Sequence, residues 1–305
     1  MRFLLERGVQ GALVLLAVSF LTFALGVLLP ADPARMAAGP SASVATVNSI
    51  RRELGLDKPF LTQYTLYLTK LLRGDLGRSY KQSASITELL ISRLPATLLL
   101  MLGGVLCELL LGLPAGVIAA LRPGSFWDRA TMGLAFLGIS LPQFVLGLGL
   151  LYAFAFIWPV LPLGGYGTAA HLILPALTLG IGGAGWYARV VRSEMLEVLG
   201  QDYVRTAAAK GVARGGLIVR HALKNALLPV IAMVGSDIGV FMGGAVVVES
   251  VFGWPGIGKL TWDAIRVVDI PVILGVVQLS AVMIVLGNLL ADLAYPLADP
   301  RVRYD

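Results

Sequence analysis

The chain has 305 residues, of which 57% are hydrophobic and 14% charged, and its formal net charge is +6. A mean hydropathy of +0.82 excludes an ordinary soluble domain. The alternation over about 10-residue segments that marks a transmembrane β-barrel is missing, so we expect an all-α polytopic membrane protein. The one cysteine, Cys107, excludes a disulfide framework within the chain. The basic residues gather in loops between apolar runs, which indicates a lipid bilayer as partner and no nucleic acid.

Several apolar runs approach or exceed the roughly 20 residues that a helix needs to cross the hydrocarbon core. The first, from Val9 to Leu29, is longer than the roughly 7–15 residues of a signal-peptide core, so we expect it to be kept as a span. Six spans are predicted, near residues 9–30, 96–121, 130–158, 171–190, 226–249 and 272–295.

Lysine and arginine in the connections set the orientation of the spans, because cytoplasmic loops are enriched in both. Thirteen of them fall on the side of the N-terminal tail and two on the other side, when the long 31–95 loop is set aside. Loops longer than about 60 residues cross largely regardless of charge. Both termini are therefore expected in the cytoplasm.

The 31–95 loop has structure of its own. The stretch SVATVNSIRRELGLDKPFLTQYTLYLTKLL reads as two short helices divided at Lys58-Pro59, since proline disfavours helical geometry in the residue before it. We therefore expect a small helical external subdomain between the first two spans.

The stretch DYVRTAAAKGVARGGLIVRHALKNALLP (202–229) is too polar for its surroundings. Good helix formers and small side chains fill Tyr203 to Lys210, and Gly211 stands where a left-handed residue would end a short helix. A second helical piece, about 217–228, leads into the next span. An alanine-rich helix presents a shallow ridge that a soluble partner could grip, while Arg205 and Lys210 could meet acids at its rim. The alternative is an ordinary basic cytoplasmic loop.

Two acids within the predicted spans are candidates for a solute path, because charges inside a membrane are costly and usually face an interior or a cavity. Glu108 lies in the second span and Asp237 in the fifth. Each could line the path or could instead form hydrogen bonds between helices.

The FGWPG stretch, with Phe252, Trp254, Pro255 and Gly256, cannot form a regular spanning helix and is expected to be a turn or re-entrant piece at the outer mouth. HExxH, GxSxG and paired Cys-His spacings are missing from the sequence, so neither a membrane protease nor a tight metal site is expected. The phosphate loop GxxxxGK[ST] is missing as well, so the chain cannot supply ATP chemistry.

Several ordered motifs resemble the dipeptide, oligopeptide and nickel permease family of ABC importers. The 202–211 stretch and the HALKNALLP stretch that follows are similar to the cytoplasmic loop of that family, with Arg205, Thr206 and Ala207 where broader ABC permeases have Glu-Ala-Ala. Further matches are RRELGLDKPFLTQY, GDLGRSY, RLPATLLL, GISLPQFVLG, VVVESVFGWPGIGKL and ADLAYPLADPRVRYD, which together extend over nearly the whole chain.

The resemblance implies a type I ABC importer permease fold that pairs with a second homologous permease as a heterodimer. It also implies two ABC ATPase subunits that use ATP and Mg, an external solute-binding protein, and the cytoplasmic (inner) membrane of a bacterium or archaeon. The chain itself would bind no cofactor and catalyse nothing. The residues implied in ATPase coupling are Tyr203, Arg205, Thr206, Ala207, Ala208, Ala209, Lys210 and Gly211.

The domain organisation expected is a tail and first span (1–30), the external subdomain (31–95), the core permease domain (96–295, with the coupling loop at about 191–225) and a cytoplasmic tail (296–305). The expected solute is a dipeptide, oligopeptide or glutathione, and nickel or a metal chelate is the alternative. A secondary transporter driven by an ion gradient is the alternative from another class, which would show two inverted halves with interrupted helices and a working ion site.

Overall fold

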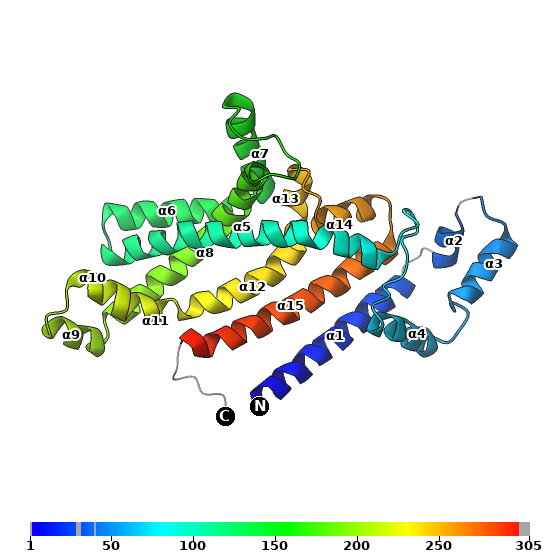
Figure 1. The fold of residues 1–305 in the computed structure, drawn as a ribbon, viewed down its shortest axis with the longest axis horizontal. Helices are drawn as coiled ribbons and strands as arrows, with labels where there is room; N and C mark the ends of the chain where they lie inside the picture. The colour runs from blue at the N-terminus through cyan, green and yellow to red at the C-terminus, as the bar shows by residue number, and fades with distance from the viewer. Residues whose placement is uncertain (1, 29–31, 40, 299–305) are drawn as a thin grey trace. The chain divides into compact units, whose positions relative to one another are not determined.

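A computed structural model describes residues 2–28, 32–39 and 41–298, and the regular elements of this part of the chain are helices (Figure 1). Four helices are long and apolar enough to cross a membrane: Leu5–Val27 within α1 (Arg2–Leu28), α5 (Ile86–Leu121), α8 (Ala169–Leu199) and Ile270–Ala294 within α15 (Ile270–Ala298). Two bent helix pairs bring the number of candidate spans to six. The all-α polytopic fold and the six apolar segments expected from the sequence are confirmed.

The first bent pair joins α6 (Phe126–Ser140) to α7 (Gln143–Leu151) and the π-helical turn η1 (Tyr152–Ile157), with a bend of 102°. Pro142 explains the bend, because its ring cannot continue the helix and it forces Leu141 into an extended conformation (φ −76°, ψ 126°). The expected single span at 130–158 is therefore two helices at nearly a right angle.

The second bent pair runs from Arg214–Ala226 into Leu228–Phe241 with a bend of 46°. The first member consists of α10 (Arg214–Gly216), η2 (Leu217–Leu223) and α11 (Lys224–Ala226), and the second belongs to α12 (Leu228–Gly244). The expected span at 226–249 also ends early, because α12 stops at Gly244 and the short α13 (Val246–Val251) follows.

Two spans are longer than their apolar runs. Helix α5 begins at Ile86 rather than 96, since it passes through Pro95, and α8 continues to Leu199 rather than 190. The end of α8 carries charged side chains that lower hydropathy without disfavouring a helix. The apolar pattern therefore marks where a membrane can be crossed and not where a helix ends.

The chain divides into two compact units, each described here by itself. We call Ala96–Lys259 with the part of the chain from Met283 the core unit, and Leu4–Pro95 with Leu260–Val282 the N-terminal unit. Helices α5, α14 (Ile257–Arg266) and α15 each contribute residues to both units. The domain boundaries expected from the sequence remain predictions.

In the N-terminal unit, α1 packs on α4 (Phe60–Leu72) through aromatic side chains: the ring of Phe23 lies 5.3 Å from that of Phe60 and 5.4 Å from that of Tyr67. The Nε2 of Gln278 donates to the Oγ1 of Thr22 at 2.7 Å, which ties α15 to α1 inside the unit. Helices α3 (Val44–Glu53) and α4 are the two helices expected on either side of Lys58-Pro59, and α2 (Pro33–Ala38) is an additional one.

Asp269 fastens the loop before α5 to the start of α15. Its carboxylate accepts a hydrogen bond from the Ser79 hydroxyl and one from the backbone amide of Tyr80 at 3.2 Å. Burial and the negative charge of Asp269 raise the pKa of the Tyr80 phenol above its ordinary value. The loop is therefore an ordered part of the unit.

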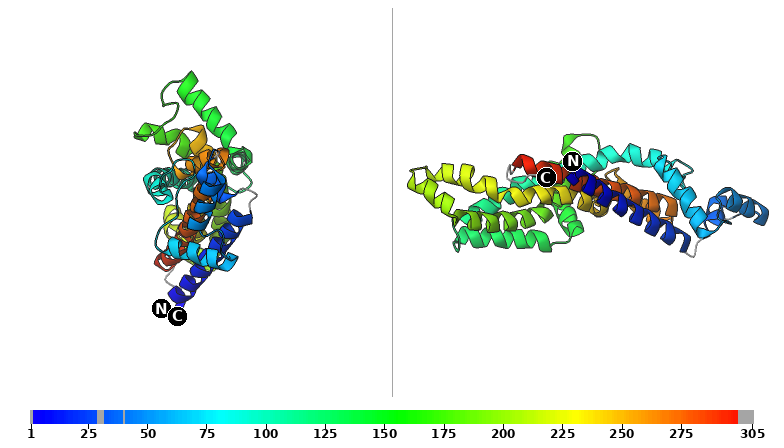
Figure 2. Two further views of the ribbon diagram at one scale, coloured as in Figure 1. Left: turned by 90° about the vertical axis from the view of Figure 1, so that its right-hand side faces the viewer. Right: turned by 90° about the horizontal axis from the view of Figure 1, so that it is seen from below.

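In the core unit, α8 is the central helix, and small residues let its neighbours approach closely. A Cβ placed on Gly112 of α5 would lie 2.6 Å from the Tyr187 Cβ and 2.7 Å from the Ala184 carbonyl oxygen. On another face, a Cβ on Gly138 of α6 would lie 2.9 Å from the Ile181 carbonyl oxygen, and Figures 1 and 2 show α6 alongside α8. These two glycines thus serve helix packing.

Candidate coupling loop and translocation site

The polar stretch 202–211 forms a short helix, α9 (Asp202–Ala209), that follows directly on the end of α8. The helix ends where the sequence predicts, since Gly211 has a φ of +81°, in the left-handed region that glycine adopts without strain. The helix is thus bounded by α8 on one side and by a left-handed glycine on the other.

The side chains of α9 divide into a buried face and an exposed face. Val204 and Ala207 are 6% and 9% exposed and point into the core unit. Ala208 and Ala209 are exposed, as are the charged residues on both sides of them. The expected ridge of Ala207 to Ala209 is therefore narrower, because Ala207 already packs against its own chain.

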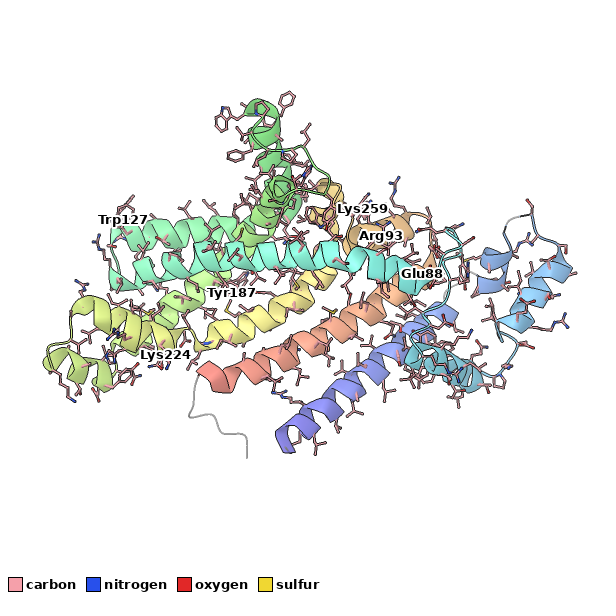
Figure 3. The ribbon with its side chains drawn as sticks, in the orientation of Figure 1. Glu88, Arg93, Trp127, Tyr187, Lys224 and Lys259 are labelled. Carbon is pink, nitrogen blue, oxygen red and sulfur yellow. The ribbon has the colours of Figure 1, made fainter. Side chains whose placement is uncertain are left out.

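A hydrogen-bonded brace holds α9 against the helical segment that follows it. The Tyr203 hydroxyl donates to the His221 carbonyl oxygen at 3.1 Å and accepts from the Nδ2 of Asn225 at 2.7 Å. Asn225 also donates to the His221 carbonyl oxygen at 3.2 Å. We call Tyr203, His221 and Asn225 the α9 brace; it connects the coupling stretch to the segment that continues into α12, close to Lys224 in Figure 3.

The cationic side chains of α9 are available to a partner. Arg205 makes an ion pair with Asp202 at 3.5 Å, but both side chains are largely exposed, and such exposed pairs contribute little. Lys210 is exposed at the end of the helix. Arg205 could exchange Asp202 for an acid on another subunit at small cost.

A bidentate ion pair fixes the end of α8 from which α9 continues. The Nε of Arg192 lies 2.6 Å from Oδ1 of Asp128, and its Nη2 lies 2.8 Å from Oδ2. Asp128 is 4% exposed and also accepts from the Gly124 amide at 2.8 Å. Sequence reasoning missed this pair, because its members are 64 positions apart.

Glu108 and Asp237, the two acids predicted within spans, meet each other. The two carboxyls interact electrostatically inside the core unit, and the Tyr187 hydroxyl donates to Asp237. The three side chains come from α5, α12 and α8, and Figure 3 labels Tyr187 along α8.

This acidic cluster is packed inside the core unit. Glu108 is 2% exposed, and its carboxyl leaves no room for a Cβ on Gly183 of α8. Its Oε2 has no hydrogen-bond partner among the described residues. The bond from Tyr187 to Asp237 joins α8 to α12, while the role of Glu108 and Asp237 in lining a path remains a prediction.

The FGWPG stretch is a tight turn between two short helices, α13 and α14. The side chains of Phe252 and Trp254 are each 1% exposed. The amide of Gly165 donates to the Phe252 carbonyl oxygen at 2.8 Å, and the Nε1 of Trp254 donates to the Ala96 carbonyl oxygen at 2.8 Å. The turn is thus fixed both to the 158–168 loop and to α5, and its place at the outer mouth remains a prediction.

Glu249 is the residue of this region that sequence reasoning missed. It is 0% exposed, yet its Oε1 accepts from the Thr97 hydroxyl and its Oε2 from the Lys259 amide, both at 2.8 Å. The signal available was an acid inside an apolar run, VVVESVF, followed by two glycines at 256 and 258. Its fixed partners could not be read from the sequence, because Thr97 is 152 positions away.

Comparison with known proteins gives one consistent result. Residues 112–304 match the family model described as binding-protein-dependent transport system inner membrane component, and residues 1–101 match the model of the N-terminal region of such membrane components. A glutathione transport system permease protein of Salmonella typhi is 41% identical over 95% of both chains. A chain of Sinorhizobium fredii, named a probable peptide ABC transporter permease protein, is 42% identical over 99% of both.

A solved structure has the same fold. The chain is similar to one from the inward-facing MetNI methionine ABC transporter, with a TM-score of 0.59, 19% identity and coverage of 69% of this chain and 96% of that one. With an all-helical fold and family models that match nearly its full length, this chain belongs to the family of binding-protein-dependent transport system inner membrane components, the permeases of ABC importers.

Proposed function

We propose that this chain is one of two homologous permeases in an ATP-driven importer of peptides, of the dipeptide, oligopeptide or glutathione type. Relatives over 95–99% of the chain carry peptide and glutathione permease names, which supports the solute class. Nickel or a metal chelate is the second candidate. An external binding protein delivers the solute, and the chain is non-catalytic, since two partner ATPases bind and hydrolyse ATP with Mg.

The observation that carries the proposal is the exposed face of α9. A helix that is buried on its Val204–Ala207 face and open at Ala208 and Ala209 is fixed to its own subunit while its small side chains remain free. We assign this face to the cleft of an ATPase subunit, with Arg205 and Lys210 paired to acids at the rim. The residues from Tyr203 to Gly211 would then transmit the ATPase motion.

The decisive test uses the complete complex in proteoliposomes. Ala208→Trp places a large ring on the exposed ridge, so we expect the binding of ATPase subunits and ATP-driven uptake to fall at least about tenfold, the effect of losing about 1.4 kcal/mol of contact. Ala213→Trp is the matched control, since Ala213 is an exposed alanine of the same loop outside α9. Equal uptake by both variants and the unaltered complex would contradict the docking assignment.

Co-purification distinguishes this proposal from a secondary transporter. We expect a second permease and two ATPases to elute with the tagged chain, and uptake to require ATP hydrolysis. Uptake driven by an ion gradient without ATPases would support the other class.

The class of solute is tested on the cognate binding protein, by measuring the shift of its melting temperature with di- and tripeptides, glutathione and Ni²⁺. Stabilisation by Ni²⁺ alone would favour the metal alternative.

A further inference from the structure

The segment from Val246 to Lys259, which we call the re-entrant segment, is bound to α5 by one connected set of hydrogen bonds. The Thr97 hydroxyl donates to Glu249 and accepts from the amide of Ile257, each at 2.8 Å. The other oxygen of Glu249 accepts from the amide of Lys259, and Lys259 is labelled in Figure 3. We call Glu249, Thr97 and these two amides the Glu249 network.

The network satisfies backbone donors that a helix cannot satisfy itself. Ile257 and Lys259 lie in the first turn of α14, whose amides have no acceptor earlier in that helix. Glu249 and Thr97 supply the acceptors from α13 and α5, so each bond joins two separate elements. Removing either side chain would take an acceptor away from a backbone amide at the start of α14.

The packing around the carboxylate leaves it no alternative position. A Cβ on Gly258 would lie 3.0 Å from Oε2 of Glu249, and the same carboxylate leaves no room for a Cβ on Gly256. Glu249 is 0% exposed and Thr97 is 1% exposed. Separating the segment from α5 would therefore take from this buried carboxylate the hydrogen bond that Thr97 donates.

We propose that Glu249 and Thr97 are positioning residues that make the re-entrant segment and α5 from Ala96 onward a single rigid body. This rests on the proposed function, in which the segment lies at the outer mouth. The mouth then opens by movement of that whole body, and the segment does not hinge away from α5 as a flap. Import depends on the network because a loose segment would let the outer mouth open without solute.

Hydrogen exchange of the complete complex in lipid tests the inference directly. The amide of Ile257 is the reporter, because its acceptor is Thr97 of α5; its exchange is measured at rest and with the ATPases trapped by ATP and vanadate. We expect protection in both states. Rapid exchange of this amide in the trapped state would overturn the rigid-body inference, since that is the behaviour of a hinged flap.

Substitutions at Thr97 supply a matched pair. Thr97→Val keeps the shape and removes the hydroxyl, so we expect exchange at Ile257 to rise about tenfold and ATP hydrolysis without binding protein to rise about threefold. Thr97→Ser keeps the hydroxyl and should restore both values. Glu249→Gln replaces one carboxylate oxygen by an NH₂ group, which would face either the Thr97 hydroxyl or the Lys259 amide, both of them donors. We expect it to act in the same direction as Thr97→Val.

The control for general loss of stability is Asp128→Asn, which weakens a buried ion pair elsewhere in the core unit. It should lower the melting temperature and leave exchange at Ile257 unchanged. Unchanged exchange in Thr97→Val, or increased exchange in Asp128→Asn, would also overturn the inference. A wild-type complex that imports nothing would refute the proposed function alone, whereas one that imports while this amide opens would refute only the rigid body.

Discussion

Hydrogen bonds between single residues connect α9, the coupling helix, to the segment that leads into α12. The sequence predicts that Tyr203, His221 and Asn225 belong to one functional stretch, but the reason lies in their contacts: a phenol, a carbonyl and an amide that fasten α9 to the helix leading into α12. The sequence offered no comparable pointer to Glu249 or to the pairing of Arg192 with Asp128. Partners that are far apart in the sequence can be identified only once the packing of the helices is known.

The α9 brace gives a prediction at this scale. Tyr203→Phe removes the hydroxyl, so we expect solute imported per ATP to fall about fivefold, which corresponds to about 1 kcal/mol for the lost hydrogen bonds. Asn225→Ala should do the same, and the double variant should be little worse than either, because both remove one shared interaction. Coupled uptake and ATPase assays measure the ratio.

Ser236→Ala is the control for the brace, since that hydroxyl bonds to the Ala232 carbonyl oxygen of its own helix at 3.0 Å. We expect it to leave the ratio unchanged. Strictly additive effects of the Tyr203 and Asn225 variants would show that the two side chains act independently.

At the scale of elements, hydropathy predicts the presence of all six apolar segments and misplaces several of their ends. The run at 130–158 is apolar throughout, so a sliding average cannot detect the bend that Pro142 introduces. Likewise, hydropathy predicts a loop at the charged end of α8. In the structure this end is helical and places Arg192 beside Asp128. A hydropathy average does not report the path of the backbone, because that path depends on contacts with the neighbouring helices.

The contact of α5 with α8 predicts which glycines matter. Gly112→Ala would place a Cβ 2.6 Å from that of Tyr187, so we expect a loss of about 1–3 kcal/mol from overpacking. Gly182→Ala is the matched substitution, because a Cβ there meets nothing within 4 Å. Thermal unfolding of the purified complex should separate the two variants by several degrees. Equal melting temperatures would show that α5 and α8 are less tightly packed than described.

At the scale of the whole molecule, the sequence predicts a permease and an orientation. The family is established by the comparisons, and the orientation remains a prediction from the distribution of lysine and arginine. That distribution separates the loop at 159–170, which holds neither residue, from the coupling stretch, which holds many. The solute cannot be read from this chain, because the proposed mechanism leaves its recognition to the external binding protein.

Cysteine labelling tests the orientation. In a Cys107→Ser background, Leu163→Cys should react with an impermeant maleimide in intact spheroplasts, since Leu163 is 66% exposed in the loop assigned to the outer side. Lys210→Cys should react only after the membrane is opened. The reverse pattern would invert the topology and place α9 out of reach of any cytoplasmic ATPase.

The bend after α6 has a consequence for how the subunit must be surrounded. Fifteen residues of helix rise only about 22 Å, short of the roughly 30 Å of a typical hydrocarbon layer. If α6 starts at one surface, its last carbonyls end at a depth where lipid tails cannot hydrogen-bond to them. Pro142 has no N–H group, so this corner has one fewer donor that needs an acceptor. The last carbonyls of α6 still need hydrogen-bond donors. The corner at Leu141 and Pro142 should therefore face protein or confined water rather than acyl chains.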